Sequence, residues 1–328
     1  MLTCTEFPSF HRVVTGRSRA FNAFLGCNVL SRKMRTHVTL PVAHHRRMTA
    51  FLSRQLRRSG RLISFLWIAA SGLWRHRKLP RNATRAQCAQ WLHETCLRGV
   101  RAFGVELSVE GTFPTHGLIV SNHLSYLDIA VYSAALPCVF VSKAEVEEWP
   151  IFGRYARWAG SVFVRRHDRA DAARANSSVR QSLNDGVPVV LFPEGTTSDG
   201  NRVLRFHSTM LQPAIDSSAP ITPTAIRYEL DDGDAAQEVC WWGDMTLVPH
   251  MWNLLGKKSI RARIVFGNRV TPADPVSKLA ERGLGLAPDI TVGALCDRKD
   301  LSRLLHDKVV RLYAGLIDKS FQSAPAQL

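Results

Sequence analysis

Short apolar runs alternate with helical segments from residue 104 onward, and this alternation constrains the fold more than any other feature of the sequence. Strands that alternate with helices predict an α/β layer with a mixed, mostly parallel central sheet flanked by helices. The run 187–192 (VPVVLF) is typical of a central strand that is buried on both faces. The expected strands are 105–109, 118–121, 139–142, 162–165, 187–192, 221–228 and 260–266. The expected helices are 85–103, 126–136, 170–183, 209–216 and 301–317.

Positive charge is concentrated in the first quarter of the chain. Residues 1–93 contain 17 Lys/Arg and one acidic residue, whereas the remainder balances 26 Lys/Arg against 26 Asp/Glu. A basic leader on a neutral body indicates contact with a polyanion, either a nucleic acid or an anionic membrane surface. A disordered basic tail without a partner is the alternative.

The leader contains one charge-free apolar stretch, residues 62–74 (LISFLWIAASGLW). As a helix it would extend about 20 Å, which is shorter than the roughly 30 Å hydrocarbon core of a bilayer. Arg54, Arg57, Arg58 and Arg61 precede the stretch, and three further cations follow it. This pattern predicts a helix that lies in one leaflet, with its cations reaching lipid headgroups. A buried helix and the core of a signal peptide are the alternatives.

We therefore expect three parts in the chain. Residues 1–47 form a basic extension that is disordered or precedes a later start at Met48, residues 48–103 form a membrane-associating helical segment, and residues 104–328 form the α/β domain. The seven cysteines are scattered and contain no CxxC pair, which fits neither a disulfide framework nor a zinc site. A reducing, cytoplasmic setting follows from this cysteine usage.

A histidine and an aspartate five positions apart occur in the stretch 121–128 (SNHLSYLD), where an expected strand gives way to a helix. Within one continuous helix, the two side chains would point to different faces. They can meet if His123 precedes the helix, Ser125 caps it and Asp128 lies in its first turn. Asp128 would then bind one imidazole nitrogen and leave the other free as a base. A capping box formed by Ser125 and Asp128 is the structural alternative.

Two further motifs follow along the chain. The run 189–196 (VVLFPEGT) ends a buried strand in a Pro-Glu-Gly turn, at the edge where ligands of open α/β sheets bind. The run 160–166 (GSVFVRR) is a strand that ends in Arg165 and Arg166, and guanidinium groups suit bidentate phosphate recognition. An ordinary surface turn and a pair of solvated arginines are the alternatives.

Together these motifs resemble the lysophosphatidic acid acyltransferase family, the 1-acylglycerol-3-phosphate O-acyltransferases of the glycerolipid acyltransferase superfamily. The family's NHxxxxD block is matched by Asn122, His123 and Asp128, and its Gly–apolar–Arg block by residues 160–166. Its FPEGT block is matched by residues 192–196, and a proline within residues 221–226 matches a fourth block. The resemblance covers residues 105–227. Thr197 departs from the arginine that commonly follows FPEGT, which leaves the substrate headgroup open.

The resemblance implies acyl transfer from acyl-CoA or acyl-carrier protein to the sn-2 hydroxyl of 1-acylglycerol-3-phosphate, which gives phosphatidic acid. His123 and Asp128 would be catalytic, without a metal or a dissociable cofactor. The substrate would be bound by Asn122, Arg165, Arg166, Glu194, Gly195 and Thr196. The enzyme would be peripheral or monotopic on the inner face of the cell membrane, with its active site on the cytoplasmic side and membrane lipids as partners.

Two alternatives are open. The acceptor could be another lysolipid, such as lyso-ornithine lipid. The second alternative is a non-enzymatic protein that binds membrane or nucleic acid. The body lacks the interleaved aromatic and basic residues of proteins that bind single-stranded nucleic acid, so no nucleic-acid partner is expected.

Overall fold

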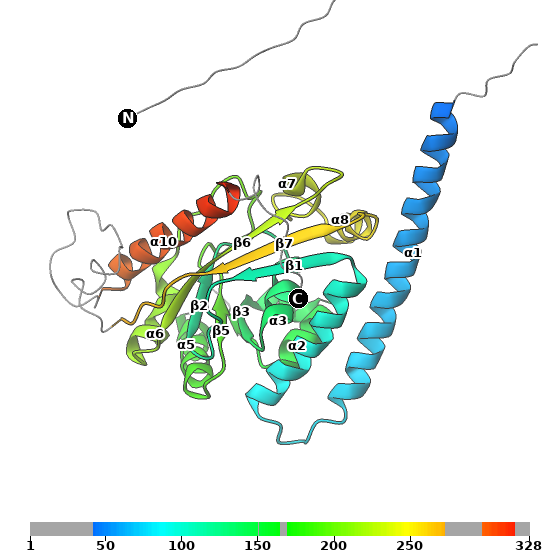
Figure 1. Ribbon diagram of the computed structural model, residues 1–328. Coiled ribbons are helices and arrows are strands. Elements are labelled where there is room, and N and C mark those ends of the chain that lie inside the picture. Colours follow the sequence, from blue (N-terminus) through cyan, green and yellow to red (C-terminus); the bar gives the residue numbers. More distant parts are fainter. Residues whose placement is uncertain (1–41, 150, 165–168, 273–296, 319–328) are drawn as a thin grey trace, which may run out of the picture. The chain divides into compact units, whose positions relative to one another are not determined.

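The computed structural model describes residues 42–149, 151–164, 169–272 and 297–318 (Figure 1). The chain divides into two compact units, Met1–Arg46 and Arg47–Leu328, and the sheet lies within the second unit.

Seven strands form one sheet in the order β1-β7-β6-β2-β5-β3-β4. Every neighbouring pair is parallel except β6 and β7, which run antiparallel. The predicted mixed, mostly parallel sheet is therefore confirmed. The strands are β1 (Val105–Glu110), β2 (Leu118–Ser121), β3 (Val139–Lys143), β4 (Val162–Val164), β5 (Val189–Leu191), β6 (Ile221–Glu229) and β7 (Ile260–Phe266).

Helices cover both faces of the sheet, as Figure 1 shows. Successive residues of a strand point to opposite faces, so Leu118 and Val120 pack on one face while Ile119 packs on the other. The first face carries α5 (Arg169–Asn184), α6 (Gln212–Asp216) and α10 (Arg298–Asp318), and the second carries α2 (Arg85–Ala102) and α3 (Leu127–Ala135). Burial on both faces explains why strands such as β5 are apolar throughout.

Local signals explain several helix ends. Thr84 and Gln87 form a capping box at the start of α2, in which each side chain bonds the other residue's backbone N–H. Gly186 follows α5 with φ of 73°, a left-handed conformation that suits glycine at the end of a helix. The predicted helix 209–216 is split, because a 3-10 turn, η2 (Ser208–Leu211), precedes α6.

The N-terminal helix is longer than the apolar stretch that predicted it: α1 covers Val42–His76. Four short elements were not predicted: η1 (Ala144–Glu148), α4 (Phe152–Trp158), α7 (Ala235–Glu238) and α8 (Leu247–Leu254). Phe65 of α1 packs against Phe103 after α2 and against Phe152 of α4, with ring centroids 6.0 Å apart in each pair. Among the described residues, no helix combines the length and apolar character needed to cross a bilayer.

Candidate active site

His123 and Asp128 meet where β2 gives way to α3. The Nδ1 atom of His123 lies 2.7 Å from Oδ2 of Asp128, and Asp128 is fully buried. The same Oδ2 atom accepts hydrogen bonds from the backbone N–H groups of Leu124 at 2.7 Å and Ser125 at 3.1 Å. The two side chains therefore meet as the spacing predicts, with His123 before the helix and Asp128 in its first turn.

The expected cap by Ser125 is absent. The helix α3 begins at Leu127 without a side-chain cap, and the buried hydroxyl of Ser125 has no hydrogen-bond partner in the described structure. Asp128 takes over part of the capping role, because its carboxylate binds the backbone N–H groups that precede the helix. Asp128 therefore makes both kinds of contact: the bond to His123 that the catalytic interpretation expects, and the bond to the backbone of Ser125 that the capping box expects.

The imidazole of His123 is held in one orientation. Its ring stacks on Phe192 with centroids 4.1 Å apart and planes inclined by 9°. A neutral imidazole that donates its Nδ1–H to a carboxylate carries its lone pair on Nε2. Within the described residues Nε2 has no hydrogen-bond partner, and His123 lines a cavity. This geometry suits a base that takes a proton from a group bound in that cavity.

Glu194 follows β5, which is the neighbour of β2 in the sheet. Its Oε2 accepts a hydrogen bond from the backbone N–H of His123 at 3.4 Å, and its Oε1 accepts one from Leu204 at 3.1 Å. Burial raises the pKa of Glu194 to about 8, although these two N–H groups lower it. Glu194 is buried at 3% exposure and bonds the loop that carries His123. Its expected contact with substrate stays a prediction.

Gly195 and Thr196 line the cavity, together with Thr197. Gly195 has φ of 74°, a backbone conformation that residues with a Cβ rarely adopt, so the turn favours glycine at this position. Both residues are placed where a bound molecule could touch them.

Asn122 has a structural contact instead of a free side chain. Its Nδ2 donates to the carbonyl of Ile226 at 3.0 Å, and its Oδ1 accepts from the N–H of the same residue at 2.9 Å. The amide thus continues the ladder between β2 and β6 beyond the end of β2. With its amide bonded at both ends and 1% exposure, Asn122 fixes the start of the loop that carries His123.

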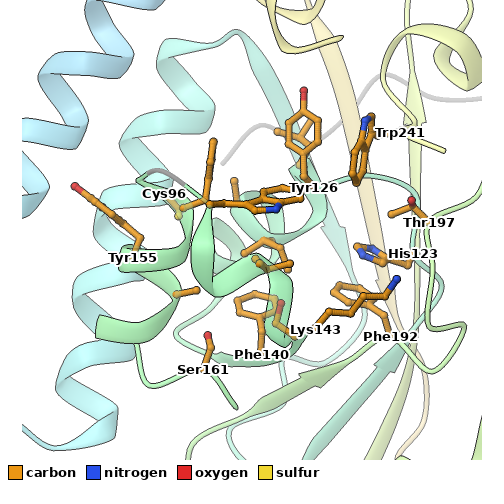
Figure 2. A pocket seen from close by; sticks show the side chains of 18 of the residues that line it. Cys96, His123, Tyr126, Phe140, Lys143, Tyr155, Ser161, Phe192, Thr197 and Trp241 are labelled. Atoms are coloured by element: carbon orange, nitrogen blue, oxygen red, sulfur yellow. The ribbon is translucent and has the colours of Figure 1, made fainter. Parts of the chain in front are cut away.

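Arg165 and Arg166 lie outside the described residues. Lys143, a cation that sequence reasoning missed, stands at the carboxyl end of β3 and is paired in register with Val164 of β4. It lines the same cavity as His123, and it is the one Lys or Arg side chain among the described lining residues (Figure 2). Its position at the end of an apolar run was the one feature of the sequence that could have marked Lys143 as a candidate site residue.

The cavity has a volume of about 960 Å³, near the upper end of the range for small-molecule sites. It extends from His123 to apolar side chains of α1, α2, α3 and α4. The apolar lining includes Leu62, Phe65, Ile68, Leu92, Val100, Phe103, Ile129, Phe140, Val146, Phe152, Met251 and Leu254. Such a cavity fits a long apolar group whose reactive end lies beside His123.

No group of three or more His, Cys, Asp or Glu side chains in the described part of the chain is arranged to hold a metal ion. The expectation that the reaction needs neither a metal nor a dissociable cofactor stays a prediction.

The arginines that precede the apolar stretch of α1 bond to protein groups. Arg61 donates to the carbonyls of Leu255 at 3.2 Å and of Lys258 at 3.0 Å, both beyond the C-terminal end of α8. Arg57 donates to the carbonyl of Gly256 at 3.3 Å, and Arg54 bonds to the side chain of Asn253.

Arg54, Arg57 and Arg61 therefore each bind a protein group, and the expectation that they also reach headgroups stays a prediction. The segment that follows α8 presents backbone carbonyls with free acceptor capacity, and guanidinium groups supply the donors. The fourth arginine, Arg58, lies over the ring of Trp252 in α8 at 5.4 Å.

Comparison with known proteins identifies relatives of this chain. A family model described as Acyltransferase matches residues 105–227. The lyso-ornithine lipid O-acyltransferase of Brucella abortus is 35% identical over 220 residues, which cover 63% of this chain and 75% of that protein. The 1-acyl-sn-glycerol-3-phosphate acyltransferase of Neisseria meningitidis serogroup B is 34% identical over 173 residues, which cover 52% of this chain and 68% of that protein. The chain belongs to the acyltransferase family.

A solved structure supports the fold. The crystal structure of the 1-acyl-sn-glycerophosphate acyltransferase PlsC from Thermotoga maritima aligns with a TM-score of 0.54 and 20% sequence identity, and the alignment covers 85% of this chain and 100% of that chain. The relatives are named for two different activities, which differ in the lipid that accepts the acyl group.

Proposed function

We propose that this protein transfers a fatty acyl group from acyl-CoA or acyl-carrier protein to the sn-2 hydroxyl of 1-acylglycerol-3-phosphate, which yields phosphatidic acid. The observation that carries the proposal is the 2.7 Å contact between Nδ1 of His123 and Oδ2 of Asp128, with the imidazole facing a large apolar cavity. A relative from Neisseria meningitidis with 34% identity is named for this activity.

The dyad accounts for the chemistry without a covalent acyl-enzyme. Nε2 of His123 takes the proton of the acceptor hydroxyl, and the oxygen attacks the carbonyl carbon of the thioester. Asp128 stabilises the imidazolium that forms. When the tetrahedral intermediate collapses, the carbon–sulfur bond breaks and the thiolate receives the proton from Nε2. The sequence contains no GxSxG nucleophile motif, in keeping with direct transfer.

Charge and shape in the cavity support a lipid anion as acceptor. Lys143 would bind the phosphate of the lysolipid together with Arg165 and Arg166, while Gly195 and Thr196 would contact the glycerol. The apolar lining that extends to α1 and α2 would hold an acyl chain. Because the cavity reaches α1, a chain could enter it from the side of that helix.

We further propose that α1 holds the active site at the inner face of the cell membrane. Nine large apolar side chains of α1 are exposed, so much of its apolar surface is not buried against the protein, although Phe65 of the same helix packs against Phe103 and Phe152. This exposure argues against the buried-helix alternative. The exposed residues are Met48, Phe51, Leu52, Leu56, Leu62, Ile63, Leu66, Trp67 and Trp74. The apolar lipid and the soluble acyl donor would then meet at the membrane surface.

A lyso-ornithine lipid O-acyltransferase is the second candidate. Thr197 lines the cavity where the resemblance leads us to expect an arginine, and a relative with 35% identity is named for this activity. Lyso-ornithine lipid lacks a phosphate, so it would need fewer cations in the site.

A comparison of the two acceptor lipids in an acyl-transfer assay tests the proposal. Purified protein in detergent and its His123→Ala variant would receive labelled palmitoyl-CoA or palmitoyl-acyl-carrier protein, with lysophosphatidic acid or lyso-ornithine lipid as acceptor. We expect phosphatidic acid from the wild-type protein and a loss of at least about 100-fold in the variant. Transfer to lyso-ornithine lipid alone would replace the first candidate with the second. Undiminished transfer by the variant would contradict the role of His123.

A further inference from the structure

The two carboxylate oxygens of Asp128 have different partners. Oδ2 binds His123 and two backbone N–H groups, whereas Oδ1 lies 2.7 Å from the hydroxyl of Tyr228. Because a carboxylate only accepts, the tyrosine is the donor in this hydrogen bond. Tyr228 is separated from Asp128 by 100 residues, and it belongs to none of the motifs found in the sequence.

Tyr228 lies on a rigid part of the sheet. It belongs to β6, which pairs with β7 on one side, where Tyr228 stands opposite Ala262, and with β2 on the other. Its side chain is buried at 3% exposure. Burial and the neighbouring Asp128 carboxylate raise the pKa of Tyr228 well above that of an ordinary phenol, so the hydroxyl keeps its proton. The result is a fixed, permanently protonated donor.

We propose that Tyr228 is a positioning residue for the catalytic base, acting through Asp128. Its hydrogen bond fixes the rotation of the carboxylate so that Oδ2 faces His123, and it withdraws negative charge from the carboxylate. This inference rests on the proposed function, in which His123 must be neutral to take a proton.

The charge effect has a defined sign. Without the hydroxyl of Tyr228, Oδ1 has no other donor among the described residues, so more of the carboxylate charge acts on the imidazole. A more negative partner stabilises the imidazolium relative to the neutral imidazole. The acid limb of the rate profile, where the base is lost to protonation, therefore moves to higher pH.

Other ionisable groups surround the dyad and stay in place in the test. Glu194 approaches from the loop after β5, Cys240 from the segment after α7, Tyr132 from α3 and Lys143 from β3. Burial raises the pKa of the Cys240 thiol to about 12 and that of Tyr132 well above its usual range, so neither titrates near neutral pH. Glu194 does titrate in this range, and its contribution is common to all variants compared.

Tyr132 supplies a matched control for Tyr228. It is also fully buried, and its hydroxyl donates a hydrogen bond of the same length, 2.7 Å, to Oγ of Ser121 instead of to Asp128. Its ring also packs against Phe192, at a centroid distance of 5.9 Å. The Tyr132→Phe variant thus loses a buried hydroxyl near the site without changing a direct contact of the dyad.

The test compares pH–rate profiles of wild-type, Tyr228→Phe and Tyr132→Phe proteins in the acyl-transfer assay. We expect Tyr228→Phe to lower kcat about tenfold and to move the acid limb upward by about 0.5 pH unit or more. Tyr132→Phe should leave the limb in place. An unmoved limb in Tyr228→Phe, or an equal movement in both variants, would overturn the proposal.

A second measurement separates this inference from the proposed function. Diethyl pyrocarbonate modifies neutral imidazole, and mass spectrometry can follow its reaction at His123 across pH without any substrate. We expect the midpoint of this reactivity to rise in Tyr228→Phe and to be unchanged in Tyr132→Phe. Reactivity that shifts as expected in a protein without transferase activity would support the role of Tyr228 and reject the reaction. Identical midpoints in all three proteins, with transferase activity present, would support the reaction and reject the role of Tyr228.

Discussion

The ring of Phe192 lies parallel to the imidazole of His123, with centroids 4.1 Å apart. Phe192 is the first residue of the FPEGT block, so an aromatic side chain of one motif supports the base of another. The hydrogen bond from Nδ1 to Asp128 fixes one edge of the imidazole, and the stack fixes its plane. A base held in this way loses little orientational freedom when it must meet a hydroxyl.

Replacement of Phe192 by leucine should therefore impair the base more than it impairs folding. We expect kcat to fall about tenfold because the imidazole can tilt, and we expect a loss of about 1–2 kcal/mol in unfolding free energy from altered packing. Phe206→Leu is the control, because Phe206 is also buried and contacts a histidine, His306, at 5.1 Å. An equal loss of kcat in both variants would show that the stack has no special role.

Lys143 should set the affinity for a phosphate-bearing acceptor. In Lys143→Met we expect the KM for lysophosphatidic acid to rise by about 10- to 100-fold, since a charge-assisted hydrogen bond contributes about 1.5–3 kcal/mol. The KM for a phosphate-free lysolipid should change less. Lys258→Met, at an exposed position outside the cavity, is the matched control. A KM that is unchanged for the phosphate-bearing acceptor would remove Lys143 from the binding site.

Glu194 should give the stability a pH dependence of known sign. Its pKa in the folded protein, about 8, lies above the ordinary 4.5, so rising pH ionises it first in the unfolded chain. The contribution of Glu194 to stability is therefore complete below about pH 4.5, and it is lost progressively as pH rises to about 8.

Glu194→Gln removes this titration. We expect the unfolding free energy of the variant, relative to wild type, to improve by up to a few kcal/mol between pH 5 and pH 8. Urea unfolding at several pH values measures this difference, and the lost hydrogen-bond acceptor shifts it by the same amount at each pH. A difference that does not change with pH would contradict the elevated pKa.

The exposed face of α1 should govern binding to lipid. Ile63 and Trp67 are 67% and 73% exposed and lie one helical turn apart. We expect Ile63→Glu/Trp67→Glu to weaken binding to anionic vesicles by about 100-fold or more, because burying each apolar side chain contributes about 1.5–3 kcal/mol. The control is Val310→Glu, an exposed apolar position on α10. Sedimentation with vesicles measures both, and equal binding by all three proteins would exclude α1 as the lipid contact.

Much of the fold could be predicted because its signals are local. Each strand is a short apolar run between turn residues, and the expected ranges 118–121 and 260–266 coincide with β2 and β7. The meeting of His123 and Asp128 could be predicted as well, since both residues lie in one strand-to-helix turn. By contrast, residues 42–61 of α1 are rich in polar and basic residues, so no apolar run marked that part of the helix.

The contacts that complete the site depend on strand order, which a single sequence does not specify. Tyr228 can reach Asp128 because β6 is next to β2, and Phe192 can reach His123 because β5 is on the other side of β2. The protein contacts of the α1 arginines were missed for a similar reason. Arg57 and Arg61 bind carbonyl groups about 200 residues away, just beyond a helix that carried no recognisable signal.

The amide of Asn122 bonds to the backbone of Ile226, which comes 104 residues later in the chain. This bond links the start of the catalytic loop to a strand that is synthesised long after the loop itself. During translation, the NHxxxxD segment emerges from the ribosome well before β6. Until β6 is synthesised, the segment lacks the hydrogen bonds between Asn122 and Ile226. A chain released before β6 is complete would contain both His123 and Asp128. It would still lack the contacts that β6 makes with Asn122 and Asp128.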